Sequence, residues 1–322
     1  MLIASIQVIG GFILLVWAAD RLVTGAAATG SNLGIPALIV GLTVVGFGTS
    51  APEMVVSAIA SMNGNAGLAV GNAIGSNITN IGLILGLTAV VYPLTVDSEV
   101  LRKQFPVLIL IMLLTTVLML DGVLSRNDGL ILLIGMIVLV LTMIMLGLRR
   151  GDSDPMIQEY EAEIPRDMPM SRSLTWLAVG LILLPVSSAF LVEGAVTIAR
   201  TYNISDTVIG LTIIAFGTSL PELAASISSA IKKEDDIAIG NVIGSNMFNM
   251  LGVLGIGAAI TRIELEAFVM QRDVIAMYIF TFVLLAMTWR LRGPGYISRS
   301  TGAVLLLLFI AFSGLVGWQT LG

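Results

Sequence analysis

The sequence predicts an all-α polytopic membrane protein, with about ten transmembrane helices arranged as two inverted five-helix repeats. Three observations predict this fold class. Of the 322 residues, 57% are hydrophobic and only 11% are charged, whereas soluble domains carry roughly 25% charged residues. Apolar segments of about 20 residues, long enough to cross a bilayer, recur along the chain. A stretch of 40 residues in the first half is repeated in the second.

The apolar segments are separated by turn signals. A membrane β-barrel would instead show short segments of alternating hydrophobicity, so we expect helices throughout. We place the spans at approximately 3–30, 36–62, 66–91, 103–120, 128–148, 173–200, 206–231, 236–260, 270–289 and 301–320.

Basic residues outside the spans predict the orientation, because cytoplasmic loops carry an excess of Lys and Arg. Eleven lie on one side and four on the other. We therefore expect both termini to be extracytoplasmic and the polar, acidic linker at 149–172 to be cytoplasmic. This linker divides the chain into a first five-helix repeat, 1–148, and a second, 173–322.

The chain contains no cysteine and no histidine. The usual sites for zinc, copper, haem and iron–sulfur clusters are thereby excluded, as are histidine proton relays. Any bound metal must be a hard cation held by oxygen. We expect no catalytic residue, no cofactor and no nucleic-acid partner, and therefore no enzyme.

The internal repeat aligns residues 41–80 with residues 210–249 without a gap, at an offset of 169, and 18 of the 40 positions are identical. Apolar composition alone would not match the shared Gly, Pro, Thr, Ser, Asn and Glu. Because five spans separate equivalent points, the second copy enters the membrane from the opposite face. Such inverted repeats are common in secondary transporters, whose substrate site lies near the midplane between interrupted helices.

The motifs GFGTSAPE (46–53) and AFGTSLPE (215–222) occupy matched places in the two copies. A proline within a helix has no N–H and clashes with the carbonyl one turn earlier, so each helix should break here and free backbone oxygens. In the first copy, Thr49, Ser50 and Glu53 share one turn. Their counterparts in the second copy are Thr218, Ser219 and Glu222.

An ionised carboxylate at the centre of the membrane costs about 2.5–3.5 kcal/mol on insertion scales. Within the repeated stretches, 41–80 and 210–249, no Lys or Arg lies in a predicted span to offset this cost. A bound cation is the natural partner for Glu53 and Glu222. The alternative for each is a protonated, structural glutamate.

The following spans carry GNAIGSNITN (71–80) and GNVIGSNMFN (240–249). The glycines in these motifs have the spacing that allows helices to approach closely. Each motif also contains a polar pair whose two members are four positions apart. The members of each pair therefore share a helix face and offer neutral oxygens. These pairs are Ser76 with Asn80 and Ser245 with Asn249.

Two carboxylates with hydroxyl, amide and carbonyl oxygens suit Ca²⁺ and Na⁺ better than Mg²⁺, which dehydrates reluctantly. One Ca²⁺, two Na⁺ or two protons would each neutralise Glu53 and Glu222. A site that is uncharged only when it is filled would cross the membrane only when loaded. This property predicts exchange rather than leak.

The paired GTSxPE and GNxIGSN motifs resemble the alpha repeats of the cation/calcium antiporter superfamily, and the whole chain resembles its bacterial sodium/calcium exchanger-like inner-membrane proteins. The resemblance implies that the Gly46 and Ala215 carbonyls join the ligand set and that the first and sixth spans slide to alternate access. Several relatives, including potassium-dependent exchangers, carry Asp where this chain has Asn249. Because this chain has Asn there and at position 80, we expect no potassium dependence.

We therefore expect a monomeric antiporter of the inner membrane that exports Ca²⁺ in exchange for Na⁺. Two alternatives remain open, a Ca²⁺/H⁺ antiporter whose glutamates protonate on the return step and a cation channel with a glutamate selectivity ring. Outside the motifs, Asp20 and Arg21 are expected to pair with each other near the interface. Glu193 remains a candidate gate or proton site.

Overall fold

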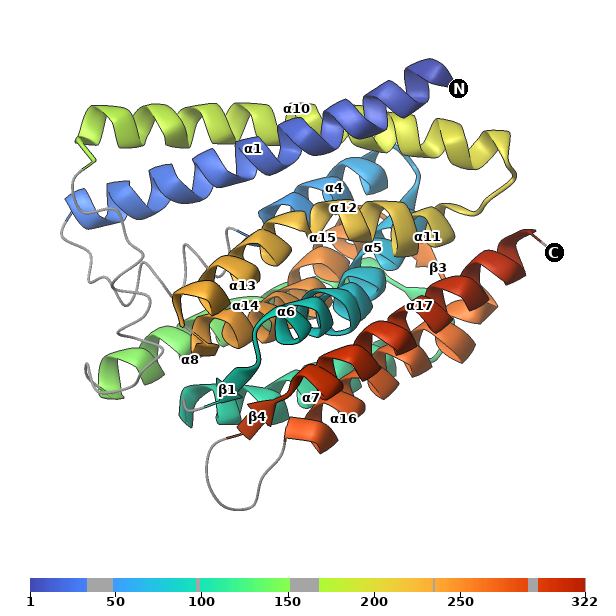
Figure 1. Cartoon of the computed structure of the whole chain (residues 1–322). Coiled ribbons are helices and arrows are strands. Elements are labelled where there is room, and N and C mark those ends of the chain that lie inside the picture. Colours follow the sequence, from blue (N-terminus) through green and yellow to red (C-terminus); the bar gives the residue numbers. More distant parts are fainter. Residues whose placement is uncertain (34–48, 97–98, 151–167, 234, 289–294, 322) are drawn as a thin grey trace.

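The computed structural model describes residues 1–33, 49–96, 99–150, 168–233, 235–288 and 295–321. These residues are mostly helical (Figure 1). Within the described residues, seven helices are long and apolar enough to cross a membrane, and one helix pair, Asp206–Thr218 with Leu220–Lys232, passes the same test with a bend of 40°. Two shorter apolar helices are Ala51–Met62 and Gln104–Leu118.

The elements, with η marking π-helical turns, are α1 (Leu2–Asn32), α4 (Ala51–Met62), α5 (Ala66–Thr79), η2 (Asn80–Leu85), α6 (Gly86–Val91), β1 (Leu94–Val96), α7 (Glu99–Leu118), β2 (Val123–Leu124), α8 (Arg126–Arg150), α10 (Met170–Thr201), α11 (Asp206–Ile209), η3 (Gly210–Ile214), α12 (Ala215–Thr218), α13 (Leu220–Lys232), α14 (Asp235–Phe248), η4 (Asn249–Val253), α15 (Leu254–Ile260), β3 (Ile263–Glu264), η5 (Val269–Val274), α16 (Ile275–Thr288), β4 (Gly295–Ile297) and α17 (Arg299–Leu321).

The helix boundaries agree with the predicted spans to within a few residues wherever the chain is described. Of the span predicted at 36–62, only the part from Thr49 onward lies within the described residues. The sequence did not predict the π-helical turns, among them those that begin at Asn80 and Asn249. A π turn rotates the residues that follow it around the helix axis. The helical runs at 66–91 and 235–260 are apolar and buried on most sides, so hydropathy does not reveal this rotation.

Two continuous helical runs form the centre of the protein. In the apolar windows of Ala66–Val91 and Asp235–Ile260, 78% and 83% of the residues are buried, against 17–39% in the other long spans. The predicted role of small residues is confirmed for α5, because a Cβ at Gly71 would collide with the Thr207 carbonyl and one at Gly75 with the Leu211 carbonyl. It is wrong for Gly244 of α14, where a Cβ would meet no atom within 4 Å among the described residues. Gly71 and Gly75 bring the two halves of the chain into backbone contact.

Helices α1 and α10 lie side by side along one side of the bundle (Figure 1). Their contacts are reciprocal. Gly11 of α1 lies against Leu191 of α10, and Gly180 of α10 lies against Leu22 of α1. Because 11 and 180, like 22 and 191, differ by the repeat offset of 169, each half of the protein makes the same contact with the other.

The two short sheets repeat this reciprocity. Strand β1 pairs antiparallel with β4, and β3 pairs antiparallel with β2. The first residues of β1 and β3, Leu94 and Ile263, again differ by 169. Figure 1 shows the β1–β4 pair at one end of the bundle and β3 near the other. Both termini lie at the same end, and the end of α8 and the start of α10 lie at the opposite end.

Candidate cation site

Each candidate glutamate lies in the first turn of a helix that begins at a proline break. The α12 helix ends at Thr218, Ser219 has φ −84° and ψ 6°, and α13 resumes with Pro221 in its first turn. Ser50 has nearly the same dihedral angles, φ −86° and ψ 1°, before α4 and its Pro52. The partial positive charge of a helix N-terminus stabilises a carboxylate placed there.

The structure brings the predicted polar residues of both halves together in the interior. The Glu53 and Glu222 side chains are fully buried. Glu53 Oε1 accepts a hydrogen bond from Ser219 Oγ over 3.4 Å, so its partner comes from the other half. Glu222 Oε1 accepts from Ser245 Oγ over 3.3 Å. Gly46, which the family resemblance adds to the set, lies outside the described residues.

Five buried oxygens of the predicted residues have no hydrogen-bond partner within the described part of the chain. Burying a polar atom without a partner costs free energy, most of all when it is charged. Oxygens of these kinds are the ligands that hard cations bind. The five atoms are Ser50 Oγ, Glu53 Oε2, Asn80 Oδ1, Glu222 Oε2 and Asn249 Oδ1.

Neither glutamate forms an ion pair with a basic residue in the described part of the chain. The carboxylates of Glu53 and Glu222 also act on each other electrostatically. A cation bound near both carboxylates would offset their mutual repulsion and the cost of burying their charges. Carboxylate, hydroxyl and amide oxygens are the kinds of ligand that hard cations bind.

Two further asparagines bind the backbone of the glutamates. They were not among the residues predicted from the sequence. Asn72 Nδ2 donates to the Glu53 backbone carbonyl over 3.3 Å, and Asn241 Nδ2 donates to the Glu222 carbonyl over 3.4 Å. Both residues belong to the identical positions of the repeat, and this identity is the signal that could have revealed them. The i to i+4 spacing rule directed attention to Ser76 and Asn80 instead.

The same asparagines bind the threonines of the opposite half. Thr218 Oγ1 donates to Asn72 Oδ1, and Thr49 Oγ1 donates to Asn241 Oδ1, each over 3.2 Å. Both threonine hydroxyls are thus engaged in contacts between the halves. The Ala215 carbonyl accepts from the Ser219 amide over 3.2 Å. The predicted roles of Thr49, Thr218 and Ala215 as cation ligands stay predictions.

Asp20 and Arg21 form an ion pair of 2.6 Å, and the Arg21 guanidinium lies 4.9 Å from the Trp176 ring centroid. The predicted pairing of these two residues is confirmed. Glu193 is exposed and accepts from Gln7 Nε2 over 3.1 Å, away from the buried carboxylates. Its role as a gate stays a prediction.

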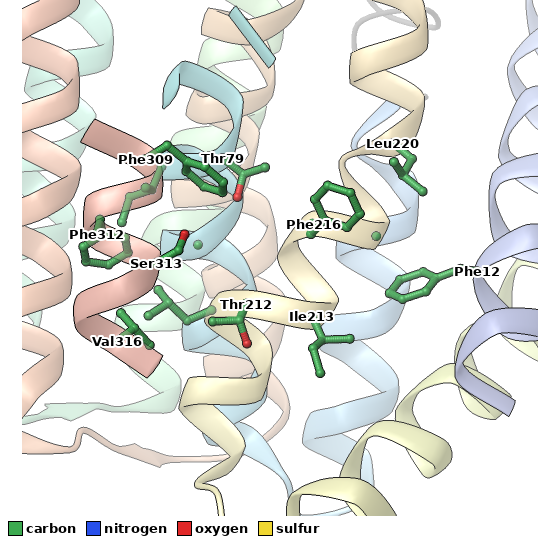
Figure 2. Close-up of a pocket in the computed structure, with 14 residues that line it drawn as sticks. Phe12, Thr79, Thr212, Ile213, Phe216, Leu220, Phe309, Phe312, Ser313 and Val316 are labelled. Carbon is green, nitrogen blue, oxygen red and sulfur yellow. The ribbon is translucent and has the colours of Figure 1, made fainter. Parts of the chain in front are cut away.

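A cavity of about 370 Å³ lies beside the broken helix, between α1 and α17. Figure 2 shows Phe12 of α1 pointing toward the α12–α13 break, with Phe309 and Phe312 of α17 on the far side. Its lining is largely apolar and includes Gly217, next to Thr218. The polar side chains of the lining are Thr79, Thr212 and Ser313, and none of them belongs to the oxygen cluster, so the cavity is distinct from it.

The chain matches the family model described as sodium/calcium exchanger protein over residues 3–145 and 172–318. It is 46% identical over 316 residues to the putative antiporter CaxA of Alkalimonas amylolytica, covering 98% of this chain and 99% of that protein. It is 42% identical over 320 residues to the inner membrane protein YrbG of Escherichia coli K12, covering 99% and 98%.

A solved structure of the sodium-calcium exchanger NCX_Mj, soaked with 10 mM Na⁺ and 10 mM Sr²⁺, superposes with a TM-score of 0.64. The two chains are 35% identical, and the superposition covers 96% of this chain and 97% of the other. Fold, site and relatives together define a multi-pass membrane antiporter. The chain belongs to the sodium/calcium exchanger family.

Proposed function

We propose that this antiporter exports Ca²⁺ in exchange for Na⁺, by alternating access at a site that both halves of the chain build. One observation carries the proposal. Two fully buried glutamates, Glu53 and Glu222, lie at matched helix breaks, and each retains a carboxylate oxygen without a hydrogen-bond partner among the described residues.

Charge explains why such a site exchanges ions. With both glutamates ionised, the empty site carries two negative charges in a medium that penalises each of them. One Ca²⁺ or two Na⁺ neutralise it, so the loaded forms can pass between inward-facing and outward-facing states while the empty form cannot. Ca²⁺ and Na⁺ would therefore compete for the same oxygens. No catalytic residue or cofactor takes part.

The proposal includes the topology. Ten spans in two inverted repeats, residues 1–148 and 173–322, would leave both termini outside the cytoplasm and the linker at 149–172 inside it. The reciprocal contacts of Gly11 with Leu191 and Gly180 with Leu22 support a two-fold relation between the halves. Both termini lie at the same end of the bundle, which supports an even number of membrane crossings (Figure 1). An inner-membrane monomer suffices, since one chain supplies both carboxylates.

The test is radioactive Ca²⁺ uptake into proteoliposomes that contain the purified full chain. Vesicles loaded with Na⁺ are compared with Na⁺-free acidic vesicles and with vesicles that have no gradient. Glu53→Gln and Glu222→Gln replace each carboxylate by a neutral isostere. Glu264→Gln, at an exposed position in β3, is the matched control for loss of one negative charge.

We expect Na⁺-driven uptake in the wild type and in Glu264→Gln, and none in either site variant. Uptake driven only by the proton gradient would indicate the Ca²⁺/H⁺ antiporter instead. Equal uptake under all loadings would indicate a channel or leak and would contradict the antiporter mechanism.

A further inference from the structure

Four buried asparagines join the central helices of the two halves. Asn77 and Asn80 lie at the α5–η2 junction, and Asn246 and Asn249 lie at the equivalent α14–η4 junction. All four side chains are at most 1% exposed. Asn80 and Asn249 are predicted ligands, whereas nothing so far has given Asn77 or Asn246 a role.

The hydrogen bonds in this cluster are reciprocal. Asn249 Nδ2 donates to Asn77 Oδ1 over 3.1 Å. Asn80 Nδ2 donates to Asn246 Oδ1 over 3.0 Å. The amide nitrogen of each predicted ligand is therefore bound to an asparagine of the opposite half. The amide oxygens of Asn80 and Asn249 are the atoms without a partner in the described part of the chain.

This orientation matters because the two ends of an asparagine amide have nearly the same shape but opposite chemistry. The oxygen can bind a cation, whereas the NH₂ group carries partial positive charge and repels it. An asparagine is therefore a dependable cation ligand only if its neighbours determine which end faces the ion. Groups behind a ligand commonly have this function in metal sites.

For Asn249 the orientation can be traced back to the backbone. Asn77 Nδ2 donates to the Asn246 backbone carbonyl over 3.3 Å. A carbonyl can only accept, so it turns the Asn77 NH₂ group toward itself and leaves Asn77 Oδ1 facing Asn249. That oxygen can also only accept, so it binds the Asn249 NH₂ group. Asn249 Oδ1 is thereby left facing the other way.

We propose that Asn77 and Asn246 are positioning residues that orient the amides of Asn249 and Asn80, so that oxygen rather than NH₂ faces the transported cation. The inference rests on the proposed function, because it assumes that a cation binds among these oxygens. It adds that each half of the protein orients a ligand of the other half. Ligand orientation then depends on contact between the repeats.

The test uses a substitution that makes orientation irrelevant. An aspartate at position 249 presents oxygen whichever way its side chain is turned. Equilibrium binding of radioactive Ca²⁺ to the purified full chain is measured for the wild type, Asn77→Leu, Asn249→Asp and the double variant. Asn127→Leu, at an exposed position in α8, is the control for the Asn to Leu change. Na⁺-driven uptake is measured in parallel.

We expect Asn77→Leu to weaken Ca²⁺ binding by about 10–100-fold, the range typical of residues that support metal ligands. In the Asn249→Asp background the same substitution should not weaken binding, because Asn77 Oδ1 then faces a carboxylate oxygen that it cannot orient. This non-additivity distinguishes orientation from packing, because a cavity or a distorted helix would weaken both backgrounds alike.

An equal loss in both backgrounds, or no loss with Asn249 in place, would overturn the inference while leaving the proposed function intact. A wild type that neither binds Ca²⁺ nor takes it up with Na⁺ would overturn the proposed function, and the inference with it. If Asn77→Leu does not yield folded protein, Asn246→Leu with and without Asn80→Asp tests the reciprocal pair with the same expected outcomes.

Discussion

The hydroxyl of Thr218 donates a hydrogen bond to the amide oxygen of Asn72 over 3.2 Å, and so joins the second half of the protein to the first beside the buried glutamates. Asn72 in turn donates to the carbonyl of Glu53. The position of Glu53 thus depends on a residue 165 positions further along the chain. Thr49 and Asn241 make the same connection in the opposite direction.

We expect Thr218→Val to destabilise the protein by about 0.5–1.5 kcal/mol, the net contribution of one hydrogen bond. Asn72 Oδ1 loses its donor from the opposite half and keeps Ser76 Oγ at 3.4 Å. Thr218→Ser keeps the hydroxyl and should cost less than about half as much. Thermal unfolding of the purified protein in detergent, followed by intrinsic fluorescence, measures the difference. Equal effects of Val and Ser would show that the methyl group matters and the hydrogen bond does not.

Gly71→Ala is expected to prevent normal packing of α5, because its Cβ would collide with the Thr207 carbonyl and the Leu211 amide nitrogen. Backbone atoms cannot rotate away as a side chain can. The matched control is Gly314→Ala in α17, where a Cβ meets no atom within 4 Å among the described residues. The control should be neutral or stabilising by about 0.5–1 kcal/mol, since alanine suits a helix better than glycine.

The yield of monodisperse protein on size-exclusion chromatography, together with its melting temperature, separates the two glycine variants. A Gly71→Ala protein that melts like the wild type would contradict the close packing between α5 and α11–η3.

The Phe12 ring lies directly against Gly217, so α1 contacts the helix break in this conformation (Figure 2). A methyl group at Gly217 would overlap the ring. We expect Gly217→Ala to displace α1 and lower the initial rate of Ca²⁺ uptake several-fold. Phe12→Ala removes the obstacle, so the double variant should recover most of the lost rate.

Comparison of initial uptake rates for the four combinations at positions 12 and 217 gives the coupling between them. Additive losses would mean that the two residues act independently and that their contact has no effect on transport.

Ca²⁺ should stabilise the folded protein, because an ion that binds only the folded state adds about 2.7 kcal/mol at a concentration 100 times its Kd. We expect the melting temperature to rise with Ca²⁺ and not with Mg²⁺, which dehydrates reluctantly. Glu53→Gln and Glu222→Gln should abolish the rise, while Glu264→Gln should retain it. A Ca²⁺ effect that survives in either site variant would place the ion elsewhere.

Much of the architecture was readable from the chain because membrane helices are specified locally. The apolar segment at 66–91 predicted one continuous helical run, which the structure contains as α5, η2 and α6. Pro221 predicted the break at Ser219, since a proline cannot continue the hydrogen-bonding ladder. The π turns at Asn80 and Asn249 escaped prediction, because nothing in the local pattern distinguishes them from α-helix.

The sequence alone determined the repeat, the matched glutamates and the oxygen-rich motifs, because a gapless alignment at an offset of 169 and the rules of helix periodicity require no knowledge of tertiary contacts. Only the tertiary structure decided that Asn72 binds Thr218 and that Asn77 binds Asn249. Helix periodicity states which residues share a face but not which face of another helix they meet. That choice depends on the packing of two halves whose contacting residues lie more than 140 positions apart.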